Sequence, residues 1–147
     1  MPQTFEYVLA DGQTKLPLRG VTLHKDDDAA RRLMYEAEHL LDAVEARVSE
    51  MGKATDAATI GKLGGVASEL RMMRDGKFRE FMVAMFGSKF GTDDIQGKII
   101  PQCTEADMIV VLRTAREGAD YLERLQKLFA PEPPPSTTPN SDSTVAP

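Results

Sequence analysis

The residues best suited to chemistry are two histidines, one cysteine and several carboxylates, and they are scattered along the chain. Glu36-Ala-Glu-His39 has the Glu-x-x-His spacing of di-iron carboxylate bundles, in which positions i and i+3 share a helix face. Such a centre needs a second pair of this kind and two further glutamates on facing helices. The other histidine, His24, stands outside the predicted helices. The set cannot be completed, so we expect His39 at the surface and no metal site.

Cys103 is the only cysteine of the chain, which excludes an internal disulfide and a cysteine-based zinc site. It stands near the start of a predicted helix, where the helix dipole lowers the pKa of a thiol. A catalytic cysteine also needs a base close by, and the sequence places neither histidine beside this one. We therefore predict a small, buried or partly exposed residue without a catalytic role.

Gly61-Lys-Leu-Gly-Gly65 matches a phosphate-binding loop only in its glycine content. The Lys-Ser/Thr pair of such a loop is missing, and no strand is predicted before it. We expect no nucleotide at this segment and no cofactor elsewhere in the protein.

A small basic cluster follows, formed by Arg71, Arg74, Lys77 and Arg79. The whole chain has a net charge of −5, and overall acidity argues against non-specific binding of nucleic acid. We expect this cluster to be a solvated face, or to pair with acidic residues of the preceding helix, namely Glu36, Glu38, Asp42 and Glu45. Because no convergent set of polar groups emerges, the sequence indicates a protein that is not an enzyme.

Two long amphipathic helices are predicted to hold the fold together. Over Ala29–Met51, apolar residues recur at helical spacing, at Leu33, Ala37, Leu40, Leu41, Val44, Val48 and Met51. One of the three aspartates Asp26–Asp28 is expected to cap the first turn. The second helix, Thr104–Phe129, begins with a Thr-x-x-Asp variant of the capping box and has a weak point at Gly118.

The start of the chain is predicted to be a β-hairpin over residues 4–23. Residue types and alternation favour a strand over Thr4–Ala10, with Gln13–Leu18 as the return strand. Asp11-Gly12 between them is a preferred pair for a two-residue type I′ turn. A lone hairpin is only marginally stable in water, so this one must dock on the helices or on another chain.

Shorter elements are predicted between the two long helices. Apolar residues from Ile60 to Met73 recur at helical spacing, although three glycines weaken this helix. Asp75-Gly76 indicates a turn, and Lys77–Phe86 a short helix. Residues 87–102 are expected to be an irregular connection that its apolar side chains hold to the core, namely Phe90, Ile95, Ile99 and Ile100.

The composition changes sharply after Ala130. Prolines stand among Ser, Thr, Asn and Asp, and such a segment cannot bury enough apolar surface to offset the entropy of ordering. We expect a single helical domain over residues 1–130 and a disordered Pro-rich tail over residues 131–147. The predicted fold class is mainly α: a small helical bundle with an N-terminal β-hairpin.

The opening MPQTFEYVLADGQ has neither a basic region nor an apolar stretch, which argues against a signal peptide. No apolar run approaches the roughly 18 residues of a membrane span. From these features and the single cysteine we expect a cytoplasmic location and no membrane contact.

The order of these elements resembles the tail assembly chaperones of long-tailed bacteriophages. The resemblance is one of architecture, from Thr4-Phe5-Glu6-Tyr7 through Asp11-Gly12 to Leu16-Pro17-Leu18 and then the long acidic helix. It implies a non-catalytic assembly factor of the host cytoplasm. Such a chaperone coats the apolar tape measure protein, keeps it soluble, helps tail tube subunits assemble around it, and is absent from the finished particle.

A partner-facing surface would use apolar residues off the main helical stripes, and the sequence offers Met34 and Leu128. Methionine occurs 8 times; its flexible side chain fills irregular core gaps and also suits surfaces that bind several partners. A homo-oligomer is compatible with this pattern. Two alternatives stay open: a small helical adaptor or regulatory protein acting on another protein, and a nucleic-acid-binding regulator that depends on the cluster from Arg71 to Arg79.

Overall fold

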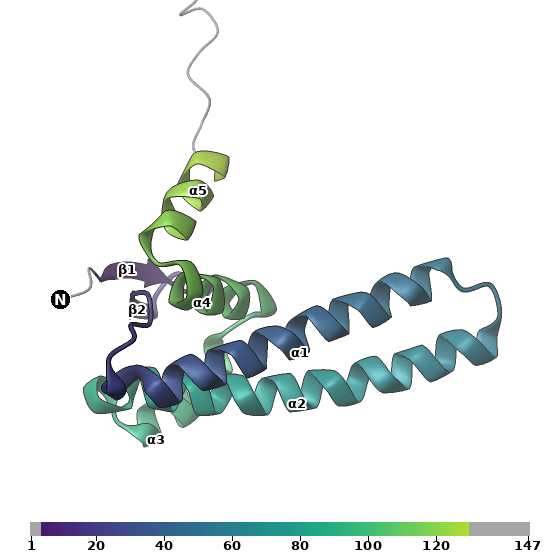
Figure 1. Cartoon of the computed structure of the whole chain (residues 1–147), viewed down its shortest axis with the longest axis horizontal. Helices are drawn as coiled ribbons and strands as arrows, with labels where there is room; N and C mark the ends of the chain where they lie inside the picture. The colour runs from purple at the N-terminus through teal and green to yellow at the C-terminus, as the bar shows by residue number, and fades with distance from the viewer. Residues whose placement is uncertain (1–3, 130–147) are drawn as a thin grey trace, which may run out of the picture.

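The computed structural model describes residues 4–129, which are mainly helical and begin with an antiparallel hairpin (Figure 1). Helices α1 (Asp28–Lys53) and α2 (Ala57–Phe90) lie side by side and antiparallel, and together they form a long arm. The hairpin and α4 (Glu105–Glu117) pack near one end of this arm, and α5 (Ala119–Phe129) projects from α4. The predicted fold class is thus confirmed for the described residues.

The predicted Pro-rich tail, residues 131–147, lies outside the described residues. The first long helix is confirmed, with its ends at Asp28 and Lys53 rather than at Ala29 and Met51. Its apolar stripe faces the core and its charged residues face the solvent, so the other elements pack against its apolar side.

The predicted hairpin is confirmed: β1 (Phe5–Val8) pairs antiparallel with β2 (Lys15–Leu18). The register places Tyr7 opposite Leu16. One face of the hairpin packs on the helices, so that Leu16 and Leu18 are almost completely buried. This docking supplies the apolar contact that a lone two-stranded hairpin lacks.

The connection between the strands differs from the two-residue type I′ turn predicted at Asp11-Gly12. The ladder ends at Val8 and Lys15, which leaves a longer loop. The Asp11 carboxylate accepts hydrogen bonds from the two backbone N–H groups of the residues at the loop exit, both at 2.9 Å. The aspartate therefore closes an Asx-type turn, and Gly12 supplies the required positive φ of 75°.

Helix α2 is continuous across Asp75-Gly76, where the sequence predicted a turn between two helices. Arg74 is buried at this point and donates to Asp75 at 3.0 Å and to Glu105 of α4 at 2.7 Å. A glycine costs a helix about 1 kcal/mol relative to alanine, whereas full burial of a phenylalanine contributes about 1.5–3 kcal/mol. The burial of Phe78 one turn further on therefore outweighs the local preference for a turn.

Helix α2 ends at Gly91, whose φ of 84° stops the helix. The segment after it is helical rather than irregular: it forms α3 (Thr92–Asp94), a π-helical turn (Ile95–Ile99) and a 3-10 turn (Ile100–Gln102). The prediction that apolar side chains hold this region to the core is confirmed for Phe90, Ile95, Ile99 and Ile100.

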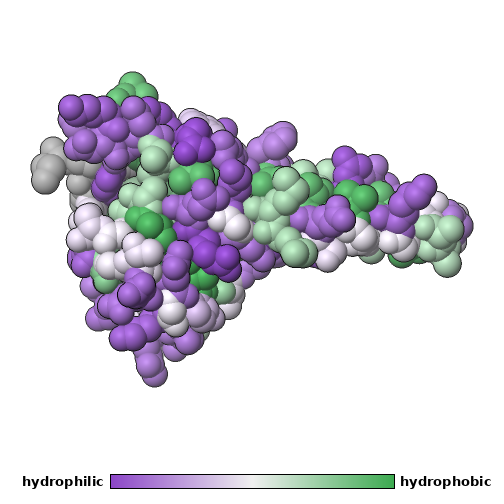
Figure 2. Space-filling model, turned by 90° about the horizontal axis from the view of Figure 1, so that it is seen from below, coloured by the Kyte–Doolittle hydropathy of each residue, from purple (hydrophilic) through white to green (hydrophobic). Residues whose placement is uncertain are grey.

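The core lies where the hairpin, α4 and the near halves of α1 and α2 meet. Its largest fully buried apolar side chains are Phe78, Phe81, Leu9, Leu16, Leu18, Met34, Met82, Ile95, Leu112 and Val111. The far half of the arm, as far as the structure describes it, is formed by α1 and α2 packed on each other. Figure 2 shows it as a narrow projection with apolar residues among polar ones. Apolar side chains that stay exposed on the arm are Val48, Ile60, Val66, Met72 and Met73.

Candidate functional site

Helix α5 is strongly amphipathic, yet none of its described side chains is fully buried. Leu122 and Leu125 are only partly covered by the core, and Leu128 keeps 78% of its surface exposed. An amphipathic helix normally covers its apolar face against a neighbouring element. Within residues 4–129 that covering is incomplete, and the open part of the face is a candidate binding surface.

A groove of about 260 Å³ runs between β1 and α5, and we call it the β1–α5 groove. Its lining residues are Phe5, Glu6, Tyr7, Leu122, Leu125 and Gln126. Two aromatic rings and two leucines form most of this lining, which suits an apolar segment. Strand β1 is also an edge strand of a two-stranded sheet, so its outer side carries unpaired backbone groups.

Asp107 fixes the hairpin to α4 and thereby holds the β1 wall of the groove. Its carboxylate accepts hydrogen bonds from the Tyr7 hydroxyl at 2.7 Å and from the Ala10 N–H at 3.0 Å. It also accepts from the Thr104 N–H at 3.0 Å, while the Thr104 hydroxyl accepts from the Asp107 N–H, which confirms the predicted capping box. Asp107 is only 1% exposed. Burial alone raises the pKa of Asp107, but these donors outweigh burial and lower the pKa.

The pKa of Tyr7 shifts in the opposite direction to that of Asp107. Burial, and next the hydrogen bond to Asp107, raise the pKa of the Tyr7 hydroxyl far above its ordinary value. The phenol therefore stays protonated and remains a donor to the carboxylate throughout the physiological range.

Gly118 divides the predicted single helix Thr104–Phe129 into α4 and α5 and sets the direction of α5. Its φ of 70° and ψ of −147° lie in a region that essentially only glycine adopts without strain. The chain leaving the hairpin runs directly over this point: the Val21 N–H donates to the Ala115 carbonyl at 2.8 Å. A Cβ on Gly20 would lie 3.2 Å from the Gly118 Cα, so the close approach depends on glycine. The sequence identified the weak point but not the change of direction.

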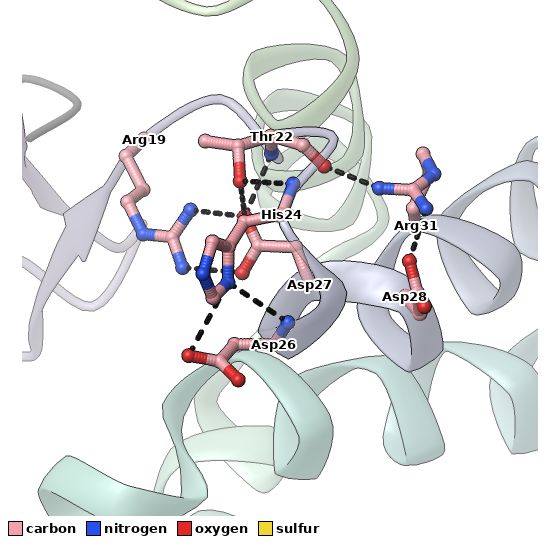
Figure 3. A network of polar contacts seen from close by, with 7 residues as sticks. All are labelled: Arg19, Thr22, His24, Asp26, Asp27, Asp28 and Arg31. Carbon is pink, nitrogen blue, oxygen red and sulfur yellow. Dashed lines mark hydrogen bonds and ion pairs between the residues drawn. The ribbon is translucent and has the colours of Figure 1, made fainter.

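A second polar network joins the hairpin to the start of α1 (Figure 3). Asp27 stands at the N-cap but makes no capping bond, contrary to the expectation that an aspartate here caps the helix. Its carboxylate instead accepts from the Arg19 guanidinium at 2.8 and 2.9 Å and from the Thr22 N–H at 2.7 Å. The guanidinium holds the pKa of Asp27 well below its ordinary value. Arg31 completes the network by donating to the Thr22 carbonyl and to Asp28.

The residues with metal-site spacing lie at the surface of α1. His39 is exposed, as predicted, and Glu36 contacts Lys77 of α2 at 2.9 Å. This contact confirms one of the expected pairings between the basic cluster and the first helix. Between residues 4 and 129, no group of three or more His, Cys, Asp and Glu side chains is arranged to hold a metal ion.

Glu38 is buried between α1 and α4, whereas the sequence suggested a partner in the basic cluster of α2. Its carboxylate lies 2.8 Å from the Arg113 guanidinium and 3.5 Å from that of Arg116. Burial raises the pKa of Glu38, and the two arginines offset part of that rise. Arg113 also reaches Asp42 at 3.5 Å. Sequence reasoning missed this ion-pair cluster because tertiary packing decides which face of α1 meets α4.

Cys103 is half-buried just before α4, and its Sγ donates to the Ile99 carbonyl at 3.5 Å. Burial, and then the charge of Asp107, raise the pKa of the thiol to about 12. The predicted buried or partly exposed position of Cys103 is confirmed, and burial outweighs the lowering effect of the helix dipole on its pKa. The thiol lines a hollow of about 260 Å³ together with Arg74 and Glu105, and neither described histidine is among the lining residues.

The glycine-rich segment Gly61–Gly65 lies inside α2, so it forms helix rather than a phosphate-binding loop. The basic cluster is divided. Arg74 is buried in ion pairs and Lys77 contacts α1, so that Arg71 and Arg79 are its exposed members.

The two residues predicted to face a partner lie in different environments. Met34 is fully buried in the core, so the expectation that it lies on an exposed surface is wrong. The hairpin and α4 cover more of α1 than its apolar stripe indicated. Leu128 is exposed at the end of α5, adjoining the face that lines the β1–α5 groove.

Within residues 4–129, none of the helices combines the length and the apolar character needed to cross a membrane. Comparison of the chain with protein-family models, with curated proteins and with solved structures finds no match. The surfaces described above are therefore the basis for a functional proposal.

Proposed function

We propose that this protein is a non-catalytic binding protein that covers an apolar helical segment of another protein. The observation that carries the proposal is the incompletely covered apolar face of α5 beside the β1–α5 groove. Leu122 and Leu125 form the floor of the proposed site, and Leu128 extends it toward the end of the helix. An amphipathic helix that laid its apolar residues here would complete the packing of α5, as in other helix-in-groove complexes.

The charges of the molecule support the same function. Two carboxylate networks, around Asp27 and Asp107, tie the hairpin to the helices and are occupied by internal donors. The net charge of −5 favours solubility of a complex whose partner is apolar. A scaffold with internal ion pairs and an open apolar face suits binding better than it suits proton transfer or nucleophilic attack.

The resemblance to tail assembly chaperones indicates which partner to test first. On that basis we propose the tape measure protein as the apolar helical partner, with tail tube subunits joining the complex, in the cytoplasm of a host cell. A helical adaptor or regulator would use the same groove on a different protein. A nucleic-acid-binding regulator has less support, because two members of the basic cluster are engaged in ion pairs.

The proposal is tested by co-expressing the full chain with an apolar helical fragment of a tape measure protein. The soluble fraction of the fragment should rise with the wild-type chain and fall back with Leu125→Glu or Leu128→Glu. Leu23→Glu is the matched control, because Leu23 is 88% exposed and is not among the residues of the groove. A fragment that is no more soluble with the wild-type chain than without it would refute the proposal.

A further inference from the structure

In the far half of α2, the face that points away from α1 has no partner within residues 4–129. Ala67 is 1% exposed and marks the side of α2 that meets α1. At other angles around the helix, Val66, Met72 and Met73 are 42%, 73% and 56% exposed. Figure 2 views the molecule from the α2 side and shows apolar side chains among polar ones along the arm. The far half of the arm is therefore a two-helix unit with apolar residues on its outside.

Two exposed glycines on this outer face, Gly61 and Gly65, have open space beside them. A Cβ added at either position would meet no atom within 4 Å. Each glycine nevertheless costs the helix about 1 kcal/mol relative to alanine. Since glycine permits close approach of another backbone, these positions suit a further helix lying against α2.

Two charged residues on the same face indicate the identity of the helix that packs there. Lys62 and Glu69 are seven residues apart, so two helical turns place them on one line along α2. Neither is among the ion pairs of residues 4–129. When two copies of α2 pack antiparallel about a two-fold axis at the midpoint of this line, Lys62 of each copy faces Glu69 of the other. The midpoint falls at Gly65 and Val66, where the open glycine allows the helices to cross.

We propose that the arm is a homodimerisation element, in which α2 packs antiparallel on α2 of a second copy and the helices cross beside Gly65. The register pairs Lys62 with Glu69 of the second copy twice, and it places Met73 over Ala58 of that copy. Two arms then form a four-helix assembly, which covers apolar residues that a two-helix arm leaves in water. The self-complementary charges favour a second copy over an unrelated helix. This surface is separate from the β1–α5 groove, so the inference stands apart from the proposed function.

Sedimentation equilibrium of the full chain tests this dimer. The wild-type chain should form a dimer, and Lys62→Glu and Glu69→Lys should each weaken dimerisation roughly tenfold or more, because like charges then face each other twice. The double variant carrying both changes should dimerise again, since its ion pairs are the same with the charges exchanged. An equimolar mixture of the two single variants should form a heterodimer for the same reason.

Lys25→Glu is the control for charge reversal, because Lys25 is exposed and lies in the turn before α1. Far-UV circular dichroism of each variant establishes that the helices are retained. A wild-type chain that stays monomeric up to its solubility limit would overturn the proposal. A dimer that both single reversals leave unchanged would overturn it equally.

Discussion

A single carboxylate, that of Asp107, links three parts of the chain: the end of β1, the loop after it and the first turn of α4. Asp107→Asn removes the charge that strengthens these hydrogen bonds, and hydrogen bonds to a charged group contribute about 1.5–3 kcal/mol. We expect the free energy of unfolding to fall by about that amount, measured by urea denaturation. Asp93→Asn, at an exposed position, should change it by less than about 0.5 kcal/mol. Equal losses for the two variants would show that Asp107 has no such linking role.

The carboxylates of Asp27 and Asp107 also predict how stability depends on pH. Both pKa values are lowered in the folded state, so the folded protein binds these protons more weakly than the unfolded chain does. Their contribution is fully present above the unfolded aspartate pKa of about 3.9, and it is lost as the pH falls below that value. The gap in unfolding free energy between the wild type and Asp27→Asn should therefore shrink from pH 7 to about pH 3. A gap that is constant over this range would contradict the assignment.

At the scale of residues, local chemistry was predictable and long-range partners were not. The capping box at Thr104 and the surface position of His39 follow from spacing within one helix, and the structure confirms both. One of Asp26–Asp28 was expected to cap α1, but the carboxylate of Asp27, which stands at the N-cap, binds the guanidinium of Arg19 instead. The partly buried position of Cys103 agrees with the prediction, and burial rather than the helix dipole decides the direction in which its pKa shifts.

Among the elements, α5 owes its position to one backbone conformation. Gly118→Ala places a Cβ at a φ of 70°, and a strained backbone of this kind costs about 1–3 kcal/mol. We expect the thermal unfolding midpoint to fall, and α5 to lose its contact with β1. Gly97→Ala is the matched control, because a Cβ there meets nothing and no positive φ is required. If the two variants have the same thermal unfolding midpoint, the positive φ at Gly118 does not require glycine.

The elements themselves were predictable wherever a long apolar stripe dominated. The hairpin, α1 and the start of the last helical region follow directly from periodicity and capping. The turn predicted at Asp75-Gly76 was wrong because ion pairs of Arg74 and the burial of Phe78 carry the helix through it. The break at Gly118 had a visible cause in the sequence, but its geometry depends on Gly20, far away in the chain.

For the whole molecule, two separate apolar surfaces predict separable behaviour. Leu125→Glu in the β1–α5 groove should abolish protection of the apolar fragment and leave self-association unchanged. Lys62→Glu on the arm should weaken self-association and leave the fragment soluble. Sedimentation and co-expression of both variants check this pattern. Loss of both properties in either variant would mean that the two surfaces act as one.

The fold class could be predicted from the sequence, but the positions of the exposed apolar surfaces could not. Which apolar residues remain in water depends on how the helices cover one another. Met34 was expected outside and is buried, while Met73, the last residue of the apolar pattern predicted from Ile60, is exposed, as is its neighbour Met72. An apolar stripe predicts that a helix has a partner; it does not say whether the partner belongs to the same molecule.

Hydrogen exchange of the full chain, followed by mass spectrometry with and without the apolar tape measure fragment, tests the binding claim most directly. We predict slower exchange on binding at β1 and α5, over Phe5–Val8 and Ala119–Phe129, because the fragment covers the groove between them. Exchange that is unchanged there, or slowed only along the arm, would contradict the account.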